Sequence, residues 1–199
     1  MAQTKKTDNS YLADKIHLRA NHLPHGDIRV LDAYAGKGKV WGGVAFLSGK
    51  KIKRLSIEKK EEEGFYLPGD NLGYLDSLDL ALFNAIDLDT YGVPFLQLKK
   101  IFSSNFHGWV YVSFIQSVFG ALPTEFLVEC GFTKDMIKKS PTLFYKRGWD
   151  YFTNWLAVNG VKTIYHREKN RKHYLAFNYA GASSEDYNSQ REGTAVSHV

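Results

Sequence analysis

Cysteine is nearly absent from this sequence, which holds one, Cys130, among 199 residues. A disulfide framework is therefore excluded, and a zinc site built on cysteine thiolates is disfavoured. Long apolar runs are also missing, because no stretch approaches the roughly 20 residues that a membrane-spanning helix needs. The first residues include lysines but no apolar block after them, unlike a secretory signal. We therefore expect a cytoplasmic protein with no membrane segment and, for Cys130, a buried structural thiol.

Excess charge of one sign is also small, with 26 Lys and Arg against 21 Asp and Glu and a net charge of +5. This is a mild bias toward a polyanionic partner such as nucleic acid. The hydrophobic fraction of 44% and the chain length suit one domain with a full-sized core. We expect that domain at residues 1–180, with a leader helix segment at 10–26 and a disordered polar tail at 181–199.

The middle of the chain alternates between runs typical of strands and runs typical of helices. Strand-like runs lie at residues 28–33, 51–58, 64–70, 81–89, 108–116, 161–167 and 172–179. Helix-like runs lie at residues 39–49, 94–104, 124–130, 133–146 and 148–160, the fourth interrupted by Pro141. This order predicts an α/β fold: a seven-stranded, mostly parallel sheet with helices on both faces and a closing antiparallel hairpin.

Acidic residues end the first four strand candidates. They are Asp32, Glu58, Asp70, Asp87 and Asp89. The carboxyl ends of parallel strands share one edge of a sheet, where ligands of open α/β sheets bind. A single acid at such a place is as easily a helix cap, but the ordered set predicts a ligand site along this edge.

The loop after the first strand, in "VLDAYAGKGKVW" at residues 30–41, narrows the ligand. Gly36 and Gly38 let the backbone turn tightly and approach a ligand. A phosphate-binding P-loop does not fit, because Leu31 and Gly38 stand where glycine and Ser or Thr are required. A dinucleotide loop fits weakly, because Trp41 replaces its third glycine. A cofactor with an ammonium for Asp32 and a carboxylate for the loop amides remains.

The same stretch is similar to the first motif, Leu-Asp-x-x-x-Gly-x-Gly, of class I S-adenosylmethionine-dependent methyltransferases. The resemblance covers residues 28–116 and implies a Rossmann-like sheet that binds S-adenosyl-L-methionine. In that family an acid after the second strand holds the ribose, which matches Glu58, and a Gly-Asp pair after the third strand meets the adenine. The implied cofactor residues are Asp32, Ala33, Tyr34, Ala35, Gly36, Gly38, Glu58, Lys59, Gly69, Asp70 and Asp87.

A second stretch, "DLDTYGVP" at residues 87–94, indicates the acceptor. It resembles the Asp-Pro-(Phe/Tyr)-Gly-x-Pro motif of tRNA guanine-N2 methyltransferases and, more distantly, the (Asp/Asn)-Pro-Pro-Tyr motif of amino-methylating DNA enzymes. Thr90 stands where those motifs have proline. The resemblance implies methylation of an exocyclic amino nitrogen of a nucleic-acid base, with RNA favoured over DNA, and catalytic roles for Asp87, Asp89 and Tyr91.

The chemistry of such a site explains these residue types. The lone pair of a base amine is delocalised into the ring, so the nitrogen is a poor nucleophile. A carboxylate such as Asp89 can accept its N–H bonds and take up the released proton. Tyr91 can stack on a base that has left its duplex. The plainer interpretation is a tight turn in which Asp89 caps and Tyr91 packs.

Basic residues on two segments are candidates for binding substrate. Lys15 and Arg19 lie four apart on the leader helix and share one face, and Lys146 and Arg147 lie among aromatic residues in "FYKRGWDYFTNW". Solvated surface charges are the alternative for all four. The histidines of the leader segment do not share one helical face with an acid cluster, so we expect no metal. Rival functions are an NAD(P)-dependent oxidoreductase and a non-catalytic nucleic-acid-binding module that keeps the cofactor fold.

Overall fold

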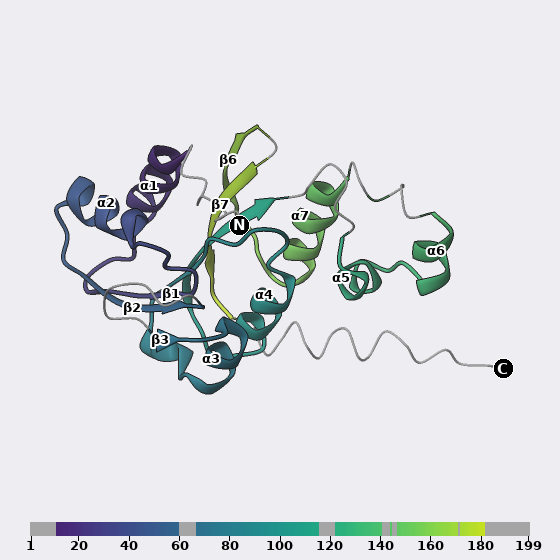
Figure 1. Ribbon diagram of the computed structural model, residues 1–199, viewed down its shortest axis with the longest axis horizontal. Helices are drawn as coiled ribbons and strands as arrows, with labels where there is room; N and C mark the ends of the chain where they lie inside the picture. The colour runs from purple at the N-terminus through teal and green to yellow at the C-terminus, as the bar shows by residue number, and fades with distance from the viewer. Residues whose placement is uncertain are drawn as a thin grey trace, which may run out of the picture.

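Seven strands form one sheet in the order β3-β2-β1-β4-β5-β7-β6 (Figure 1). The computed structural model describes residues 11–59, 67–115, 122–140, 144, 147–170 and 172–181, so Lys146 and residues 182–199 of the predicted tail lie outside it. The strands are β1 (Ile28–Asp32), β2 (Ile52–Glu58), β3 (Leu67–Pro68), β4 (Ala85–Leu88), β5 (Gly108–Ile115), β6 (Tyr165–Lys169) and β7 (Lys172–Tyr179).

The pairing pattern confirms the predicted sheet. β3, β2, β1, β4 and β5 are parallel neighbours, and β7 is antiparallel to both β5 and β6. The hairpin differs in detail from the prediction, since β6 begins at Tyr165 rather than at residue 161 and continues through Lys169. The connection is therefore two residues long, and Asn170 adopts a φ of 49° there. Asparagine tolerates this left-handed conformation, which tight hairpin turns require.

Helices cover both faces of the sheet, as the alternation predicted. They are α1 (Leu12–Asn21), α2 (Lys39–Ser48), α3 (Asn71–Ser77), the 3-10 turn η1 (Leu80–Leu82), α4 (Phe95–Phe102), α5 (Thr124–Glu129), α6 (Lys134–Lys139) and α7 (Gly148–Val158). The predicted helix at 133–146 is shorter, because the residue before Pro141 disfavours helical geometry and α6 ends at Lys139.

These helices bury two apolar clusters, one on each face of the sheet. On one face, α1 and α2 bury Leu18, Trp41 and Val44 against β1 and β5. On the other face, α3, α4, α5 and α7 bury a larger cluster rich in aromatic rings, in which Phe95 and Trp155 make edge contacts with Phe126. The sheet is therefore sandwiched, and its carboxyl edge opens between the two layers.

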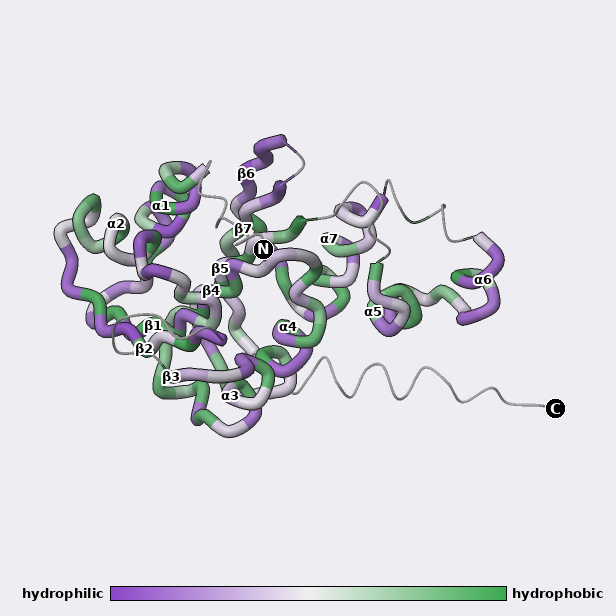
Figure 2. The backbone as a smooth tube through the Cα atoms, in the orientation of Figure 1, coloured by the Kyte–Doolittle hydropathy of each residue, from purple (hydrophilic) through white to green (hydrophobic). Residues whose placement is uncertain are grey.

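The sheet registers place the strand-end acids along this carboxyl edge. Asp32 pairs in register with Ser56 of β2 and with Asp87 of β4, so Asp32 and Asp87 are neighbours across two strands. Glu58 ends β2, beside the start of the segment that leads to Asp70. Figure 2 shows the central strands as mixed or apolar and the outer strand β6 as hydrophilic. Within the described residues, no helix has the length and apolarity to cross a membrane.

Candidate cofactor and substrate site

The loop between β1 and α2 is a tight turn that depends on its glycines. The amide of Gly38 donates to the carbonyl of Ala35 at 2.8 Å, and Gly36 and Gly38 have φ angles of 49° and 67°. A Cβ on Gly38 would also lie 2.8 Å from a guanidinium nitrogen of Arg54. The backbone conformation thus favours glycine at residue 38, whereas the guanidinium is the end of a flexible side chain that can move aside. The turn delivers the chain into α2, which begins at Lys39.

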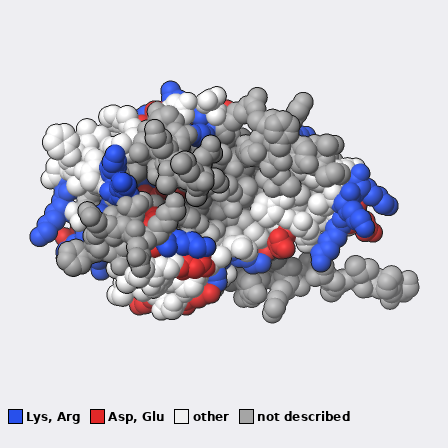
Figure 3. Space-filling model, in the orientation of Figure 1, with Lys and Arg blue, Asp and Glu red and all other residues white. Residues whose placement is uncertain are grey.

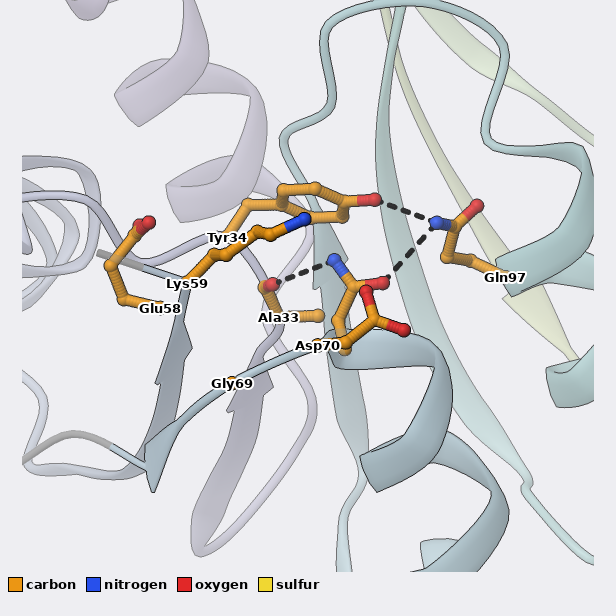
Figure 4. A pocket seen from close by; sticks show the side chains of 8 residues that line it. Ala33, Tyr34, Glu58, Lys59, Gly69, Asp70 and Gln97 are labelled. Carbon is orange, nitrogen blue, oxygen red and sulfur yellow. Dashed lines mark hydrogen bonds between the residues drawn. The ribbon is translucent and has the colours of Figure 1, made fainter. Parts of the chain in front are cut away.

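A cavity of ≈ 230 Å³ opens beside this loop, over the ends of β1, β2 and β3 (Figure 4). Its lining residues are Ala33, Tyr34, Glu58, Lys59, Gly69, Asp70, Asn71 and Gln97. In Figure 4, Glu58 and Gln97 lie on opposite sides with Tyr34 between them. The cavity is slightly below the roughly 300 Å³ at which small-molecule sites begin, so its size suits part of a cofactor.

Hydrogen bonds fix the walls of this cavity. The carboxylate of Glu58 accepts a hydrogen bond from the amide of Gly36 at 2.8 Å, which ties the end of β2 to the glycine loop. The amide nitrogen of Gln97 donates to the Tyr34 hydroxyl at 2.7 Å and to Asn71 at 3.3 Å. Burial raises the pKa of Tyr34, so the hydroxyl stays protonated at neutral pH. The cavity therefore offers the carboxylates of Glu58 and Asp70, one aromatic ring and the side-chain amides of Asn71 and Gln97.

At the carboxyl end of β4, an ion pair covers the edge of the sheet. Arg19 from α1 donates to both oxygens of Asp87, from Nε at 2.6 Å and from Nη2 at 2.7 Å. The indole of Trp41 donates to the same carboxylate at 2.7 Å. Both charged side chains are only 1% exposed. Burial opposes the charge on Arg19, but the adjacent Asp87 outweighs it and raises the pKa of the guanidinium above its ordinary value.

Asp32 is buried beside this pair. Its carboxylate lies 3.7 Å from Nη1 of Arg54, which reaches over from β2. Burial, followed by repulsion from Asp87, raises the pKa of Asp32 well above its usual value, against the opposing charges of Arg54 and Arg19. The ionised form of Asp32 is therefore held in the fold at a cost.

Asp89 follows β4 and is held by two neighbours. Lys15 of α1 binds its Oδ2 at 2.7 Å, and the hydroxyl of Ser113 donates to its Oδ1. Burial would raise the pKa of Asp89, but Lys15, Arg19 and Ser113 together lower it. With 18% of its side chain exposed, Asp89 is an ionised acceptor at the edge of the protein.

Thr90 and Tyr91, the next two residues of this loop, differ in their exposure to solvent. Thr90 is buried, its amide donates to the carbonyl of Leu88 at 2.8 Å, and its hydroxyl donates to the carbonyl of Ser113 at 2.8 Å. Tyr91 is 72% exposed. The loop is thus anchored to β5 by the residue that replaces proline, and it presents an aromatic ring to solvent.

The structure divides the residues that the sequence nominated into three groups. One group lines the cavity: Ala33, Tyr34, Glu58, Lys59, Gly69 and Asp70. Another group forms the ion pairs and adjoining rim, namely Lys15, Arg19, Asp32, Asp87 and Asp89, with Ala35, Gly36 and Gly38 in the glycine loop and Tyr91 exposed in the loop of Asp89. Arg147 stands apart, paired with Asp150 at 3.1 Å on the surface. The roles assigned to these residues toward ligands stay predictions.

Five residues of the site were not nominated from the sequence: Trp41, Arg54, Asn71, Gln97 and Ser113. Asn71 directly follows the Gly-Asp pair, and Gln97 is a polar residue in the otherwise apolar first turn of α4, so both had a weak signal. Arg54 sits in a strand whose even positions face α2, which could have placed it beside Asp32. Ser113 carried no distinguishing pattern.

The sequence predicted no metal site and no catalytic role for Cys130. In the described part of the chain, no three or more His, Cys, Asp or Glu side chains gather as a metal site would require. Cys130 is half-buried, and its thiol lies 3.9 Å from the carbonyl of Tyr151. Burial, aided by Glu129, raises the pKa of Cys130 to about 11. The thiol is therefore protonated at neutral pH and a poor nucleophile.

Comparison with known proteins shows the fold alone. No family model matches the sequence, and no curated protein matches it. A possible exported protein from Bordetella parapertussis aligns with 87% of this chain and 68% of its own, with a TM-score of 0.57 and 8% identity. An O-methyltransferase family protein from Burkholderia thailandensis aligns with 88% of this chain and 57% of its own, with a TM-score of 0.49 and 8% identity. The first likeness shows a shared architecture, and the second is too weak to support an inference.

Proposed function

We propose that the protein is an S-adenosyl-L-methionine-dependent methyltransferase that acts on an exocyclic amino nitrogen of a nucleic-acid base, RNA in preference to DNA. One observation carries the proposal. One cavity at the carboxyl edge of the sheet is lined by Ala33 and Tyr34 of the glycine loop, by Glu58 and by the Gly69-Asp70 pair, all nominated as cofactor residues, and Glu58 is bound in turn by the amide of Gly36.

The lining of the cavity suits the nucleoside half of this cofactor. A carboxylate has about four acceptor sites, so Glu58 can hold the Gly36 amide and still accept from ribose hydroxyls. Tyr34 provides a ring beside the base, and Asn71, Gln97 and Asp70 provide polar groups that can read its edge. The cofactor, when bound, supplies an electrophilic methyl group. The chain's own part is to align it with the acceptor.

Asp89 suits the acceptor side. Its pKa is held below the usual value, so it is ionised and can accept the N–H bonds of a base amine. If a methyl group were transferred to the amine nitrogen, Asp89 could take up the proton that the nitrogen loses, or pass it on to water. Tyr91, exposed next to it, is placed to stack on the base.

A second candidate, a non-catalytic nucleic-acid-binding module, has one observation in its favour. Both oxygens of Asp89 are engaged, one by Lys15 and one by Ser113, so the carboxylate has fewer acceptor sites left for a base amine. An oxidoreductase that binds a dinucleotide has less support. The buried indole of Trp41 fills the place of the third glycine, where a dinucleotide loop requires close helix packing.

Calorimetry on the cofactor site tests the proposal first. S-adenosylhomocysteine should bind the wild-type chain, and Glu58→Gln should bind it roughly 10- to 100-fold more weakly, because charge-assisted hydrogen bonds are lost. Glu125→Gln, an exposed acid in α5, removes the same charge and should change nothing. Binding of NADH without binding of S-adenosylhomocysteine would reject the proposal in favour of an oxidoreductase.

Transfer of a labelled methyl group to total RNA then separates catalysis from binding alone. Asp89→Asn should lower the transfer rate by about 10²- to 10⁴-fold, the usual contribution of a positioned base, and should leave cofactor affinity intact. Asp135→Asn in α6 is the matched control. Cofactor binding without transfer by the wild-type chain to RNA or DNA would favour the non-catalytic module.

A further inference from the structure

One face of the β6–β7 hairpin carries two histidines that meet the start of α7. Glu168 pairs with His173, and His173 pairs with Phe114 of β5, so these three side chains share one face of the sheet. His166 lies two residues before Glu168 and shares that face, because side chains alternate along a strand. Trp149, in the first turn of α7, stacks on both histidines. Three strands and a helix therefore meet at this stack of rings.

The two histidine rings lie side by side over one face of the Trp149 indole. The ring centroids of His173 and His166 lie 4.2 and 4.3 Å from the indole centroid, at interplanar angles of 8° and 23°. The two histidine centroids are 5.2 Å apart, which is too short for rings on opposite faces of the indole. Nε2 of His166 and Nδ1 of His173 are 3.0 Å apart, within hydrogen-bond distance. An edge contact with Phe114, at 5.8 Å, holds the indole against β5.

The contact between the two histidine rings limits how many protons they can hold. One nitrogen must donate its hydrogen and the other must accept it with a lone pair, so one of the two facing nitrogens carries no proton. A single positive charge is tolerated, because a cation is attracted to the face of an indole. A second proton would place two N–H groups and two positive charges against each other. The closed stack therefore holds fewer protons than the separated rings can bind.

The charged groups around the stack do not reverse this preference. Burial lowers the pKa of both His166 and His173, against the opposing charge of the exposed Glu168, and His166 lowers the pKa of His173 further. Arg147 and Asp150, at the start of α7, pair with each other at 3.1 Å. Figure 3 shows Lys and Arg in separated groups over the visible face, and the group over α6 lies away from the hairpin. Both rings are therefore easier to protonate when they leave the stack.

We propose that Trp149, His166 and His173 form a histidine clasp, which holds the start of α7 against the β6–β7 hairpin at neutral pH and releases it in mild acid. Release separates the two rings, so that each can take up a proton and be hydrated. His166 is already exposed, whereas Trp149 and His173 are half-buried, so the clasp can open from its outer side. The inference goes beyond the proposed function and depends on neither its cofactor nor its acceptor.

The direction of the pH effect follows from the lowered pKa of the two rings. Above the ordinary histidine pKa of about 6.5, neither the closed nor the open clasp takes up protons, and the closed form has its full stability. As pH falls from this value toward the lowered pKa of His166 and His173, the open form binds more protons. The opening equilibrium then rises by up to about tenfold per pH unit for each extra proton. Below the lowered pKa, the rise ends.

An NMR titration of the histidines in the full chain tests the limit on protons. His166 and His173 should titrate in separate steps, with at least one apparent pKa well below about 6.5. In His173→Phe, which keeps a ring on the indole, His166 should titrate in one step, above the lower step of the wild type. Titration of both wild-type rings at or above about 6.5 would overturn the proposal, because the closed clasp would then hold both protons.

Hydrogen exchange measured by mass spectrometry tests the release. After correction for the intrinsic pH dependence of exchange, amides of α7 and of the hairpin should lose protection by about 3- to 10-fold between pH 7.5 and pH 5.5. The double variant His166→Phe with His173→Phe takes up no proton at the clasp and should keep its protection. His25→Gln, which removes an exposed histidine outside the clasp, should behave as the wild type does. Equal losses in the wild type and the double variant would overturn the proposal.

A third histidine with a lowered pKa requires a control. Burial and the charge of Arg167 lower the pKa of His22, which stacks on Tyr165 on the other face of the hairpin. His22 is kept in every variant, so its effect cancels in the comparison. If the double variant melts well below the wild type at pH 7.5, His173→Phe alone takes its place in the exchange experiment. A loss of protection in that variant equal to the wild-type loss would also overturn the clasp.

Discussion

Over β4, the strand-end acid Asp87 is enclosed by Arg19 and Trp41, whereas over β2 the strand-end acid Glu58 borders a cavity of ≈ 230 Å³. Both acids stand at the same edge of one sheet. The difference comes from α1, which lies over β4 and supplies cations to Asp87 and, through Lys15, to Asp89.

Acidic residues at equivalent strand ends therefore have different physical roles. The closed half contributes to stability, because its charges are buried and depend on one another. The open half contributes little to stability, because its groups keep contact with water. Similar substitutions should therefore change stability by different amounts in the closed half, around Asp87 and Asp89, and in the open half, around Glu58. The expected effects are given from the largest to the smallest.

Arg19→Met should have the largest effect. It leaves Asp87 buried without its cation, which costs about 3–5 kcal/mol of unfolding free energy and roughly 10 °C in melting temperature. Adding Asp87→Asn should recover most of the loss, since the uncompensated charge is removed while Trp41 keeps an acceptor. Urea denaturation measures all three proteins. Arg147→Met, whose pair with Asp150 is exposed, should cost no more than about 1 kcal/mol.

Lys15→Met should cost less, about 1–2 kcal/mol at neutral pH, because the pair with Asp89 is partly exposed. Asp89 has a lowered pKa in the folded chain, so the pair stabilises the fold above the ordinary carboxyl pKa of about 4. That stability is lost as pH falls through the lowered pKa of Asp89.

Denaturation of wild type and Lys15→Met at pH 7 and pH 3 checks this sign. The difference in unfolding free energy should shrink at the lower pH. A difference that grows in acid would show that Lys15 acts through something other than the ionised Asp89.

Asp32→Asn should act in the opposite direction and raise the melting temperature by a few degrees, for a gain of about 1 kcal/mol. The raised pKa of Asp32 means that its ionisation opposes folding. The cost to wild type appears as pH rises from about 4 to the folded pKa and is constant above it. The variant should therefore match wild type in acid and exceed it at neutral pH, while binding S-adenosylhomocysteine more weakly. Calorimetric melting across this pH range, beside the binding titration, measures both.

Gln97→Ala, in the open half, should have the smallest effect on stability, about 0.5–1 kcal/mol for its hydrogen bonds to Tyr34 and Asn71. Affinity for S-adenosylhomocysteine should fall several-fold, because the wall of the cavity loses its fixed amide. A loss of unfolding free energy as large as that for Arg19→Met would show that the two halves do not differ in their contribution to stability.

Much of the fold could be predicted from the sequence, because strand and helix runs alternate with clear periodicity. The seven strands and the closing hairpin followed from that pattern, with the hairpin connection expected at residues 168–171. Boundaries were less accurate where local geometry decides, as at the start of β6 at Tyr165 and its end at Lys169. These positions depend on local backbone geometry that periodicity does not encode.

The candidate site was predictable in part for the same reason. Motif spacing identified Glu58 and the residues at 69–70 because their neighbours in sequence are also their neighbours in the sheet. The ion pairs of Lys15 and Arg19 join residues 74 and 68 positions apart, and only the docking of α1 brings them together. Arg54 was missed for that reason too, since its partner lies on another strand.

Thr90 has a mechanical consequence. A proline ring would restrain one torsion of the loop, but the Thr90 hydroxyl fastens the loop to the backbone of the adjacent strand. The loop that carries Asp89 and Tyr91 is therefore tied to the end of β5, and β5 pairs in turn with β7. A group bound above this loop would thus be positioned by the sheet itself.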